Sequence, residues 1–447
     1  MTLTGRKGLV LGLGETGLSI ARWVARQGGA VRVADTRAAP PALAALRAVL
    51  PQARVTTGSL VPALLDGVDL VAASPGVPLA DPVVATALAR GLEVVGDVEL
   101  AARFFAEQGS AHGGAQGGAR VIAITGTNGK STVTALAGAM CRAAGVDCEV
   151  AGNISPAVLT ALAARLDSGR LPEALVLELS SFQLETTAAL RPDAATVLNV
   201  SADHLDRYPD LASYAAAKAR IFAGSGVQVL NRDDPASMAM RLAGLRAVTF
   251  GLNPAPDHDD FGLLKVFGEH WLAMGATPLM PVREMRLAGL HNAANALAAT
   301  ALCRAIGLPL APLLDALRAF AGLPHRVERI GEIGGVIFYD DSKGTNVGST
   351  VAALSGLSRQ LNGSGGKVVL IGRDAPSIER ALASSGTPIE RAASMQEAVV
   401  RAFEAARAGD VVLLSPACAS FDMFANYHQR GEVFCAAVKE LQHAGAC

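Results

Sequence analysis

The stretch from residue 120 to residue 140 constrains the fold most, because a strand pattern, a glycine-rich loop and a helix pattern follow one another directly. Apolar RVIAIT leads into GTNGKST, and the chain continues as TVTALAGAM. The loop is a phosphate-binding loop shortened by two residues, since only Thr127 and Asn128 separate Gly126 from Gly129. Its glycines let backbone N–H groups converge on phosphate oxygens, Lys130 neutralises their charge, and a hydroxyl group can reach Mg²⁺. The predicted phosphate-binding residues are Gly126, Thr127, Asn128, Gly129, Lys130, Ser131 and Thr132.

Strand and helix patterns alternate along most of the 447 residues. Parallel strands need crossover helices that cover both faces of the sheet, so this alternation predicts an α/β fold. We predict three domains over 1–96, 97–323 and 324–447, each with a largely parallel sheet flanked by helices. The first is expected to be Rossmann-like, the central one a P-loop-type ATPase and the last Rossmann-like. Strands are predicted near 8–13, 31–34, 70–73, 92–95, 120–125, 174–180, 194–201, 336–339, 367–372 and 411–415.

Two segments lack this alternation. Residues 109–119 read GSAHGGAQGGA, and this glycine content predicts a flexible connector rather than a helix or packed strand. Residues 227–285 are less regular, and we assign them no element and no chemistry.

Bulk composition excludes several classes of protein. The formal net charge is only -1, which argues against the clustered basic surface of a nucleic-acid-binding or membrane-binding protein. The six cysteines form no CxxC pair and are interpreted as buried thiols of a reducing compartment. The N-terminus has no signal-peptide pattern, and the longest uncharged run, 287–303, contains His291, Asn292 and Asn295. These features predict a cytoplasmic protein.

A second glycine turn lies near the N-terminus. Gly12, Gly14 and Gly17 fit GxGxxG between a predicted strand and a helix, and Asp35 ends the next strand. This pattern is typical of an NAD-dependent oxidoreductase, but its physics is only a tight turn with exposed amides at a helix N-terminus. Such a turn holds any diphosphate, so the pattern does not decide between an NAD site and a site for another diphosphate.

Polar residues follow two predicted strands beside the phosphate loop. Glu178 ends the apolar ALVLELS, and Asp203 with His204 follows AATVLNVS. In an open parallel sheet these ends face the ligand crevice, where a carboxylate and an imidazole can hold a divalent ion that bridges phosphates. A helix-capping acid and a core histidine are the alternatives. Taken by itself, Lys218 is an ordinary helix lysine, for which composition favours solvent exposure. Spacing does not decide whether Asn292 and Asn295 cap or line a helix or offer amides to an adenine.

These residues lie in a series of longer motifs that resembles the Mur ligases of peptidoglycan synthesis along essentially the whole chain. The motifs are GLGETGLS, DTR, SPG, ITGTNGKST, ELSSFQL, NVSADHLDRY, YAAAKARIF, GLHNAANALAA, LPHRVE, DDSKGTN and SPACASFDMFANYHQRG. The sequence DSK at 341–343 indicates the family members that add D-glutamate. The compressed phosphate loop is the form found in Mur ligases and in their relative, folylpolyglutamate synthase.

The resemblance implies a role for each matching residue. UDP would be held in the first domain by Gly14, Thr16, Asp35, Thr36, Arg37, Ser74 and Gly76, with Asn153, Ser180 and Gln183 along the path of the muramoyl-alanine. ATP would be bound by the phosphate loop and by Asn292, Asn295, Arg326 and Asp341. Mg²⁺, expected as two ions, would be bound by Ser131, Glu178, His204 and Lys218, the lysine carrying a carbamate made from CO₂. Lys130, Glu178, His204 and Lys218 would be catalytic, and Lys343, Thr345, Ser420 and Tyr427 of the last domain would surround D-glutamate.

The resemblance thus implies a monomeric ATP-dependent ligase that joins D-glutamate to UDP-N-acetylmuramoyl-L-alanine. The alternatives are another Mur-type ligase, a folylpolyglutamate-synthase-like enzyme, or an oxidoreductase. One position departs from the family: VVLIGRDAPSIE places Ala375 where a lysine faces the glutamate side chain. A dicarboxylic substrate still needs a cation there, so we predict that Arg373 replaces the lysine in binding D-glutamate. The alternative is that Arg373 is a solvated loop residue.

Overall fold

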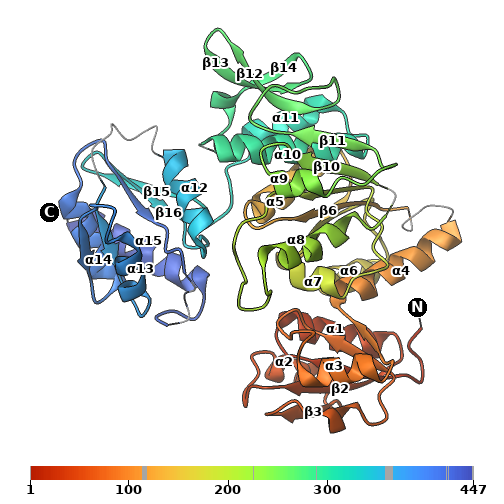
Figure 1. Ribbon diagram of the computed structural model, residues 1–447. Coiled ribbons are helices and arrows are strands. Elements are labelled where there is room, and N and C mark those ends of the chain that lie inside the picture. The colour runs from red at the N-terminus through yellow and green to blue at the C-terminus, as the bar shows by residue number, and fades with distance from the viewer. Residues whose placement is uncertain are drawn as a thin grey trace. The chain divides into compact units, whose positions relative to one another are not determined.

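The computed structural model describes residues 2–112, 118–224, 226–287, 289–357, 366–418, 420 and 422–444 (Figure 1). They form two compact units. The first unit comprises Met1–Glu284 with Ala294–Arg318, and the second comprises Met285–Ala293 with Ala319–Cys447.

The first unit begins with a five-stranded parallel sheet in the order β3-β2-β1-β4-β5. Its strands are β1 (Lys7–Leu11), β2 (Ala30–Asp35), β3 (Arg54–Thr57), β4 (Leu70–Ala73) and β5 (Glu93–Val95). The connecting helices are α1 (Glu15–Arg26), α2 (Leu43–Val49), η1 (Pro62–Leu65) and α3 (Pro82–Ala89), and α4 (Asp97–His112) follows β5. The parallel sheet predicted for this part of the chain is confirmed.

Close backbone packing explains the glycine turn between β1 and α1. A Cβ atom at Gly17 would lie 1.9 Å from the Gly12 carbonyl oxygen, and Gly12 itself has a φ of 83°. A side chain at either position would push α1 away from the sheet or strain the turn.

A nine-stranded sheet follows in the order β14-β13-β12-β11-β10-β9-β6-β8-β7. Its strands are β6 (Arg120–Thr125), β7 (Cys148–Gly152), β8 (Ala174–Glu178), β9 (Ala194–Val197), β10 (Val227–Asn231), β11 (Ala247–Phe250), β12 (Phe261–Val266), β13 (Glu269–Met274) and β14 (Thr277–Pro281). The strands from β7 to β12 pair in parallel, whereas β12, β13 and β14 form antiparallel hairpins. The segment left unassigned from sequence therefore supplies five strands of this sheet.

The helices of this part follow the strands in turn. They are α5 (Lys130–Ala143), α6 (Val158–Asp167), α7 (Ser181–Glu185), α8 (Leu211–Ala219), η2 (Arg220–Phe222), α9 (Pro235–Ala239), η3 (Val282–Glu284), α10 (Leu290–Ala305) and α11 (Leu310–Ala319). The central strands are buried on both faces, as β8 illustrates: four apolar residues precede Glu178 at its end, and all five are buried. The buried strands position their polar carboxyl ends at one edge of the sheet.

The second unit has a three-stranded sheet in the order β15-β16-β19 and a parallel pair, β17 with β18. The strands are β15 (Glu328–Ile333), β16 (Val336–Asp340), β17 (Val368–Leu370), β18 (Ile389–Arg391) and β19 (Val411–Leu414). The helices are α12 (Val347–Leu357), α13 (Ala375–Leu382), α14 (Met395–Ala405) and α15 (Tyr427–Ala444). Phe338, Val399 and Phe434 belong to its buried apolar core.

One sequence prediction needs correction. Residues 109–112 of the predicted connector belong to α4, which continues to His112. The preceding DVELAARFFAEQ is a strong helix sequence, and its helix extends into the glycine-containing segment. Residues 113–117 lie outside the described residues, and the domain boundaries stay a prediction. In the part of the chain that the structure describes, no helix is long and apolar enough to cross a membrane.

Candidate active site

The phosphate loop joins the end of β6 to the start of α5. Gly129 has a left-handed backbone with φ 83° and directly precedes Lys130, the first residue of α5. A Cβ atom at Gly129 would lie 2.6 Å from the Asn295 Oδ1 atom, so only glycine lets Asn295 of α10 approach the loop this closely. The positive N-terminal end of α5 therefore forms a site suited to an anion.

Asn199, just after β9, holds the phosphate loop in place. The Thr127 and Asn128 N–H groups donate to the Asn199 carbonyl and Oδ1 oxygens at 2.8 Å and 2.9 Å. The Asn199 amide donates back to the Asn128 carbonyl at 3.1 Å. Sequence reasoning missed Asn199, although its place after a parallel strand is the same signal that identified Glu178.

Lys130 and Lys218 converge on one backbone oxygen. Each ammonium group donates to the Gly126 carbonyl at 2.9 Å, and Lys130 also donates to the Thr127 carbonyl at 2.9 Å. Lys218 is only 1% exposed, and its Nζ lies 4.4 Å from the centre of the Tyr214 ring. Burial, and then the charge of Lys130, lower the pKa of Lys218 well below its usual value. Both effects shift Lys218 toward the neutral amine, and its burial shows that the exposed-lysine alternative is wrong.

Glu178, at the end of β8, has one occupied oxygen and one buried oxygen without a hydrogen bond. Its Oε1 accepts from the Asn153 side-chain amide at 2.7 Å. Among the described residues, no hydrogen-bond donor reaches its Oε2, which is fully buried. A buried carboxylate oxygen is costly unless a cation or donor satisfies it, and Mg²⁺ prefers such oxygen ligands. This orphaned oxygen fits a metal site.

His204 follows β9 on a left-handed backbone with φ 54°. Its ring lies 4.8 Å from the Phe182 ring and 6.1 Å from the Tyr214 ring, centre to centre. The His204 side chain is 45% exposed. Its partial burial, assisted by the charges of Lys130 and Lys218 and opposed by Asp203, lowers its pKa. A neutral imidazole is the form that binds a metal. The charges of Lys130, Glu178 and Lys218 also interact, so the structure brings the four predicted catalytic residues into one neighbourhood.

A cavity of about 460 Å³ lies beside the first glycine turn. The residues predicted to contact the UDP substrate that line it are Gly14, Thr16, Asp35, Thr36, Arg37, Ser74, Gly76, Asn153 and Gln183. Ser180 does not line it; instead its hydroxyl caps α7 by accepting from the Gln183 N–H at 3.2 Å. Gln183 donates onward to the buried Asp97 carboxylate at 3.3 Å and 3.4 Å.

Asp35 is buried and accepts hydrogen bonds from residues in and beside the wall of this cavity. The Arg37 side chain donates to both of its carboxylate oxygens, at 2.8 Å and 2.6 Å, and the Leu13 N–H donates at 2.6 Å. The Arg37 hydrogen bond is the main cause that lowers the pKa of Asp35 to about 2, against the opposing effect of burial. Both oxygens are already engaged by protein donors, so this acid positions Arg37 and the glycine turn.

In the second unit, Asp341 and Arg326 interact electrostatically. Burial raises the pKa of the Asp341 carboxyl to about 6, although the Ser415 hydroxyl donates to it at 2.9 Å. Lys343 Nζ lies 5.0 Å from the centre of the Tyr427 ring. Sequence reasoning missed Arg430, whose buried side chain donates to the Ser342 hydroxyl and carbonyl oxygens at 3.1 Å and 2.7 Å and so fixes the DSK segment.

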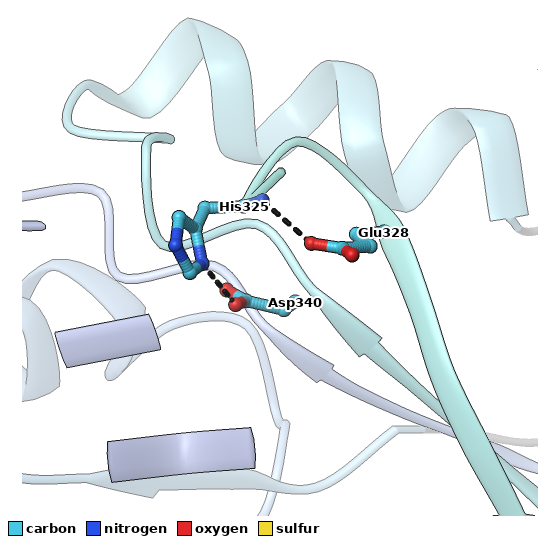
Figure 2. Close-up of side chains that lie close together, drawn as sticks. All are labelled: His325, Glu328 and Asp340. Carbon is cyan, nitrogen blue, oxygen red and sulfur yellow. Dashed lines mark hydrogen bonds and ion pairs between the residues drawn. The ribbon is translucent and has the colours of Figure 1, made fainter. Parts of the chain in front are cut away.

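His325, Glu328 and Asp340 form a polar cluster beside Arg326 (Figure 2). Their potential ligand atoms lie within 4.8 Å of one another. The His325 Nδ1 atom is 2.6 Å from Asp340 Oδ2, the His325 N–H donates to Glu328 at 2.8 Å, and the Ser342 N–H donates to Asp340 at 2.8 Å. These internal hydrogen bonds satisfy the cluster without an ion. It fixes the turn in which His325 and Val327 have φ of 60° and 48°.

Two family descriptions match the chain: the Mur ligase middle domain over residues 124–303 and the MurD-like N-terminal domain of Mur ligases over residues 6–96. The chain belongs to the Mur ligase family.

Relatives of high identity share their full length with this Mur ligase. The UDP-N-acetylmuramoylalanine--D-glutamate ligase of Nitrosospira multiformis is 56% identical over 469 aligned positions, covering 100% of this chain and 98% of that protein. The ligase of the same name from Thiobacillus denitrificans is 54% identical, covering 99% and 98%.

Solved structures share the Mur ligase fold at low identity. The UDP-N-acetylmuramate-alanine ligase of Thermotoga maritima has a TM-score of 0.59 at 18% identity, covering 97% of this chain and 99% of that one. A pseudomurein peptide ligase type C from Methanothermus fervidus has a TM-score of 0.57 at 16% identity, covering 98% and 100%. The predicted α/β fold of several domains with mostly parallel sheets is confirmed.

Family membership makes this chain a ligase of peptidoglycan precursor synthesis that uses ATP and Mg²⁺. The oxidoreductase alternative is thereby wrong. The glycine turn that suggested NAD belongs to the MurD-like N-terminal domain.

The remaining predicted residues of this Mur ligase have varied surroundings. Asn292 is buried in the first turn of α10, and Ser420 is buried, whereas Thr345 is exposed. Arg373 is 77% exposed at its side chain, which lies 3.6 Å from Asp374. Its backbone N–H donates to Asp422 at 2.8 Å, which ties the loop of Arg373 to the segment that contains Ser420.

Proposed function

We propose that this Mur ligase joins D-glutamate to UDP-N-acetylmuramoyl-L-alanine through an acyl phosphate. The substrate carboxylate attacks the γ-phosphorus of ATP, forming a C–O–P linkage and releasing ADP. The amine of D-glutamate then attacks the acyl carbon, the C–O bond to phosphate breaks, and amide, inorganic phosphate and a proton are released. Activation is needed because an oxide ion is a prohibitive leaving group.

One observation carries the proposal. Lys130 and Lys218 both donate to the Gly126 carbonyl of the phosphate loop, and Glu178, whose Oε2 has no hydrogen-bond partner, interacts electrostatically with Lys218. Lys130 is placed to stabilise negative charge on the transferred phosphoryl group, whose charge is spread over its oxygens. The N-terminus of α5 adds backbone N–H donors. Full-length identity of 56% to a D-glutamate ligase supports the choice of substrates.

Ser131, Glu178 and His204 would hold Mg²⁺, and we propose two ions. Mg²⁺ supplies charge neutralisation between the phosphate oxygens and the attacking carboxylate. The second ion would need a further anion, which Lys218 provides if its neutral amine adds CO₂ and loses a proton to form a carbamate. The lowered pKa of Lys218 favours that reaction because only the neutral amine is nucleophilic.

The cavity of about 460 Å³ would hold the UDP-sugar. Gly14, Thr16, Ser74 and Gly76 line it beside the start of α1, where backbone N–H groups suit a diphosphate. Arg37 would pair with the diphosphate or the uridine from its anchorage on Asp35. Asn153 lines the cavity and also donates to Glu178, so the muramoyl end would approach the metal ligands there.

ATP would take its remaining contacts from Asn292 and Asn295 at the adenine and from Arg326 and Asp341 at the phosphates and ribose. D-glutamate would be bound by Lys343, Thr345, Ser420, Tyr427 and Arg373. The Lys343 ammonium beside the Tyr427 ring is suited to a carboxylate, and Arg373 is the cation of its loop. We place the reaction in the cytoplasm, where ATP and nucleotide-linked sugars are made, and expect a monomer.

A phosphate-release assay tests the proposal. Purified protein is supplied with ATP, Mg²⁺, UDP-N-acetylmuramoyl-L-alanine and one amino acid from a panel containing D-glutamate, L-glutamate, D-aspartate, L-lysine and glycine. The expected result is stoichiometric phosphate and amide product with D-glutamate. Product formation with L-lysine in place of D-glutamate, or with pteroyl glutamate in place of the UDP-sugar, contradicts the proposal.

A further inference from the structure

Arg207 connects two regions that are far apart in the sequence. Its side chain is 11% exposed and donates to the Pro75 carbonyl at 2.6 Å and to the Glu185 carboxylate at 2.7 Å. Pro75 belongs to the SPG turn after β4 and lines the cavity proposed for the UDP-sugar. Glu185 ends α7, which begins three residues after Glu178. The guanidinium therefore joins the cavity wall to the helix that follows the metal-ligand strand.

The same arginine reaches His204 in two ways. Its backbone N–H donates to the His204 carbonyl at 3.0 Å. Its guanidinium carbon lies 3.8 Å from the centre of the Phe182 ring, and the His204 ring lies 4.8 Å from that ring. The left-handed φ of 54° at His204 is uncommon among residues other than glycine, and contacts from its surroundings stabilise it. Arg207 and Phe182 supply these contacts.

We propose that Arg207 is a positioning residue that couples the wall of the UDP-sugar cavity to the orientation of His204. A displacement of the SPG turn would be transmitted to the His204 loop by the Arg207 guanidinium. This group contacts the Pro75 carbonyl, the Glu185 carboxylate and the Phe182 ring. The inference rests on the proposed function, because its readout is the binding and turnover of the UDP-sugar.

The chemistry of the site favours positioning over mere stabilisation. Glu185 is 15% exposed, so both partners of the ion pair lose much of their hydration, and such pairs contribute little net stability. Arginine can serve Pro75, Glu185 and the Phe182 face at once because its donors form a planar fork. Lysine keeps the charge but cannot make the two diverging hydrogen bonds and the stacking contact together.

The test compares R207K with R220K in the full-length protein. Arg220 is the control: it is exposed, but it also donates to two carbonyl oxygens near α7, those of Leu184 at 2.7 Å and Thr187 at 2.9 Å. For R207K we expect a tenfold or greater rise in KM for UDP-N-acetylmuramoyl-L-alanine and in the Mg²⁺ concentration for half-maximal activity. The KM for ATP should stay within twofold. R220K should leave all three constants within twofold.

Calorimetry without ATP measures the affinity for UDP-N-acetylmuramoyl-L-alanine as a second readout. This affinity should be weaker in R207K and unchanged in R220K. If R207K does not fold, E185Q replaces it: this change keeps an acceptor but removes the charge, and we expect a smaller shift of the same constants. Normal constants in folded R207K or E185Q, or equal changes in R220K, overturn the inference. Wild-type protein without ligase activity would instead overturn the proposed function.

Discussion

Lys130 and Lys218 share a single acceptor: both ammonium groups lie 2.9 Å from the Gly126 carbonyl oxygen. Burial, and then repulsion from the charge of Lys130, lower the pKa of Lys218, so this lysine loses its proton more readily than an exposed lysine. Replacing Lys218 with Met keeps the length and apolar stem and removes the amine. We predict that K218M lowers kcat at least a thousandfold while its thermal midpoint is unchanged or higher, because no buried amine needs to be desolvated.

The matched control for Lys218 is K265M, on the exposed side of β12. It should keep wild-type kcat. Protein equilibrated with ¹³C-bicarbonate should show a carbamate carbon signal by NMR that is absent from K218M. Wild-type kcat in K218M would remove Lys218 from the site, and a missing carbamate signal in wild-type protein would reject the carbamate alone.

Glu178 tests the metal assignment. We predict that E178Q raises the Mg²⁺ concentration for half-maximal activity by ten- to a hundredfold, because an amide replaces the carboxylate whose Oε2 is orphaned. A Mg²⁺ titration of initial rates measures this. The control E173Q alters an exposed glutamate just before β8 and should leave the titration unchanged. An unaltered titration in E178Q rejects this ligand.

The features predicted from sequence were those that depend on local order along the chain. Glu178 and the phosphate loop were predicted because parallel strands present their carboxyl ends at the same edge of a sheet, a rule that needs no tertiary information. The Arg430 bonds to Ser342 were not predicted, because this pairing of α15 with the segment after β16 depends on tertiary packing. The Tyr214 ring lies one turn before Lys218 on α8, but the burial of both side chains depends on how α8 packs.

The hairpin strands β12 to β14 were missed for a different reason. The turn between β12 and β13 places Phe267 and Gly268 at φ of 49° and 85°. Turns of this kind are recognised in a sequence by Asn or Gly at the first left-handed position, and a phenylalanine there hides the signal. The exposed Phe267 side chain shows that solvent, not the core, accommodates this residue.

Asp35 predicts a pH dependence of stability. Its pKa of about 2 in the folded chain is below the value of 3.8 for the unfolded chain, so the ionised form stabilises the fold. This contribution is complete above about pH 4 and is lost as pH falls toward about 2. Because the Arg37 side chain is half exposed, we expect D35N to lower the free energy of unfolding at pH 7 by about 1 to 2 kcal/mol.

Urea unfolding at a series of pH values measures this effect. The difference in the free energy of unfolding between wild-type protein and D35N should become smaller as pH falls from about 4 to about 2. The exposed Asp66 provides the control, and D66N should change stability by less than about 0.5 kcal/mol at every pH. A constant difference over that range contradicts the role given to the Asp35 carboxylate.

A substitution at Arg373 tests whether this arginine replaces the lysine that the family has at the position of Ala375. We predict that R373A raises the KM for D-glutamate at least tenfold and changes the KM for ATP less than twofold, because the side-chain carboxylate loses its cation. R380A, an exposed arginine on α13 of the same region, should leave both constants unchanged. If R373A keeps the wild-type KM for D-glutamate, another residue selects the side chain.

The acyl phosphate is tested most directly by following oxygen from the substrate carboxylate. UDP-N-acetylmuramoyl-L-alanine carrying ¹⁸O in both carboxylate oxygens is converted with ATP, Mg²⁺ and D-glutamate, and the phosphate and amide product are analysed by mass spectrometry. The mechanism predicts one ¹⁸O atom in each released phosphate and one in the new amide carbonyl. Unlabelled phosphate, or phosphate release without a D-glutamyl amide, would contradict it.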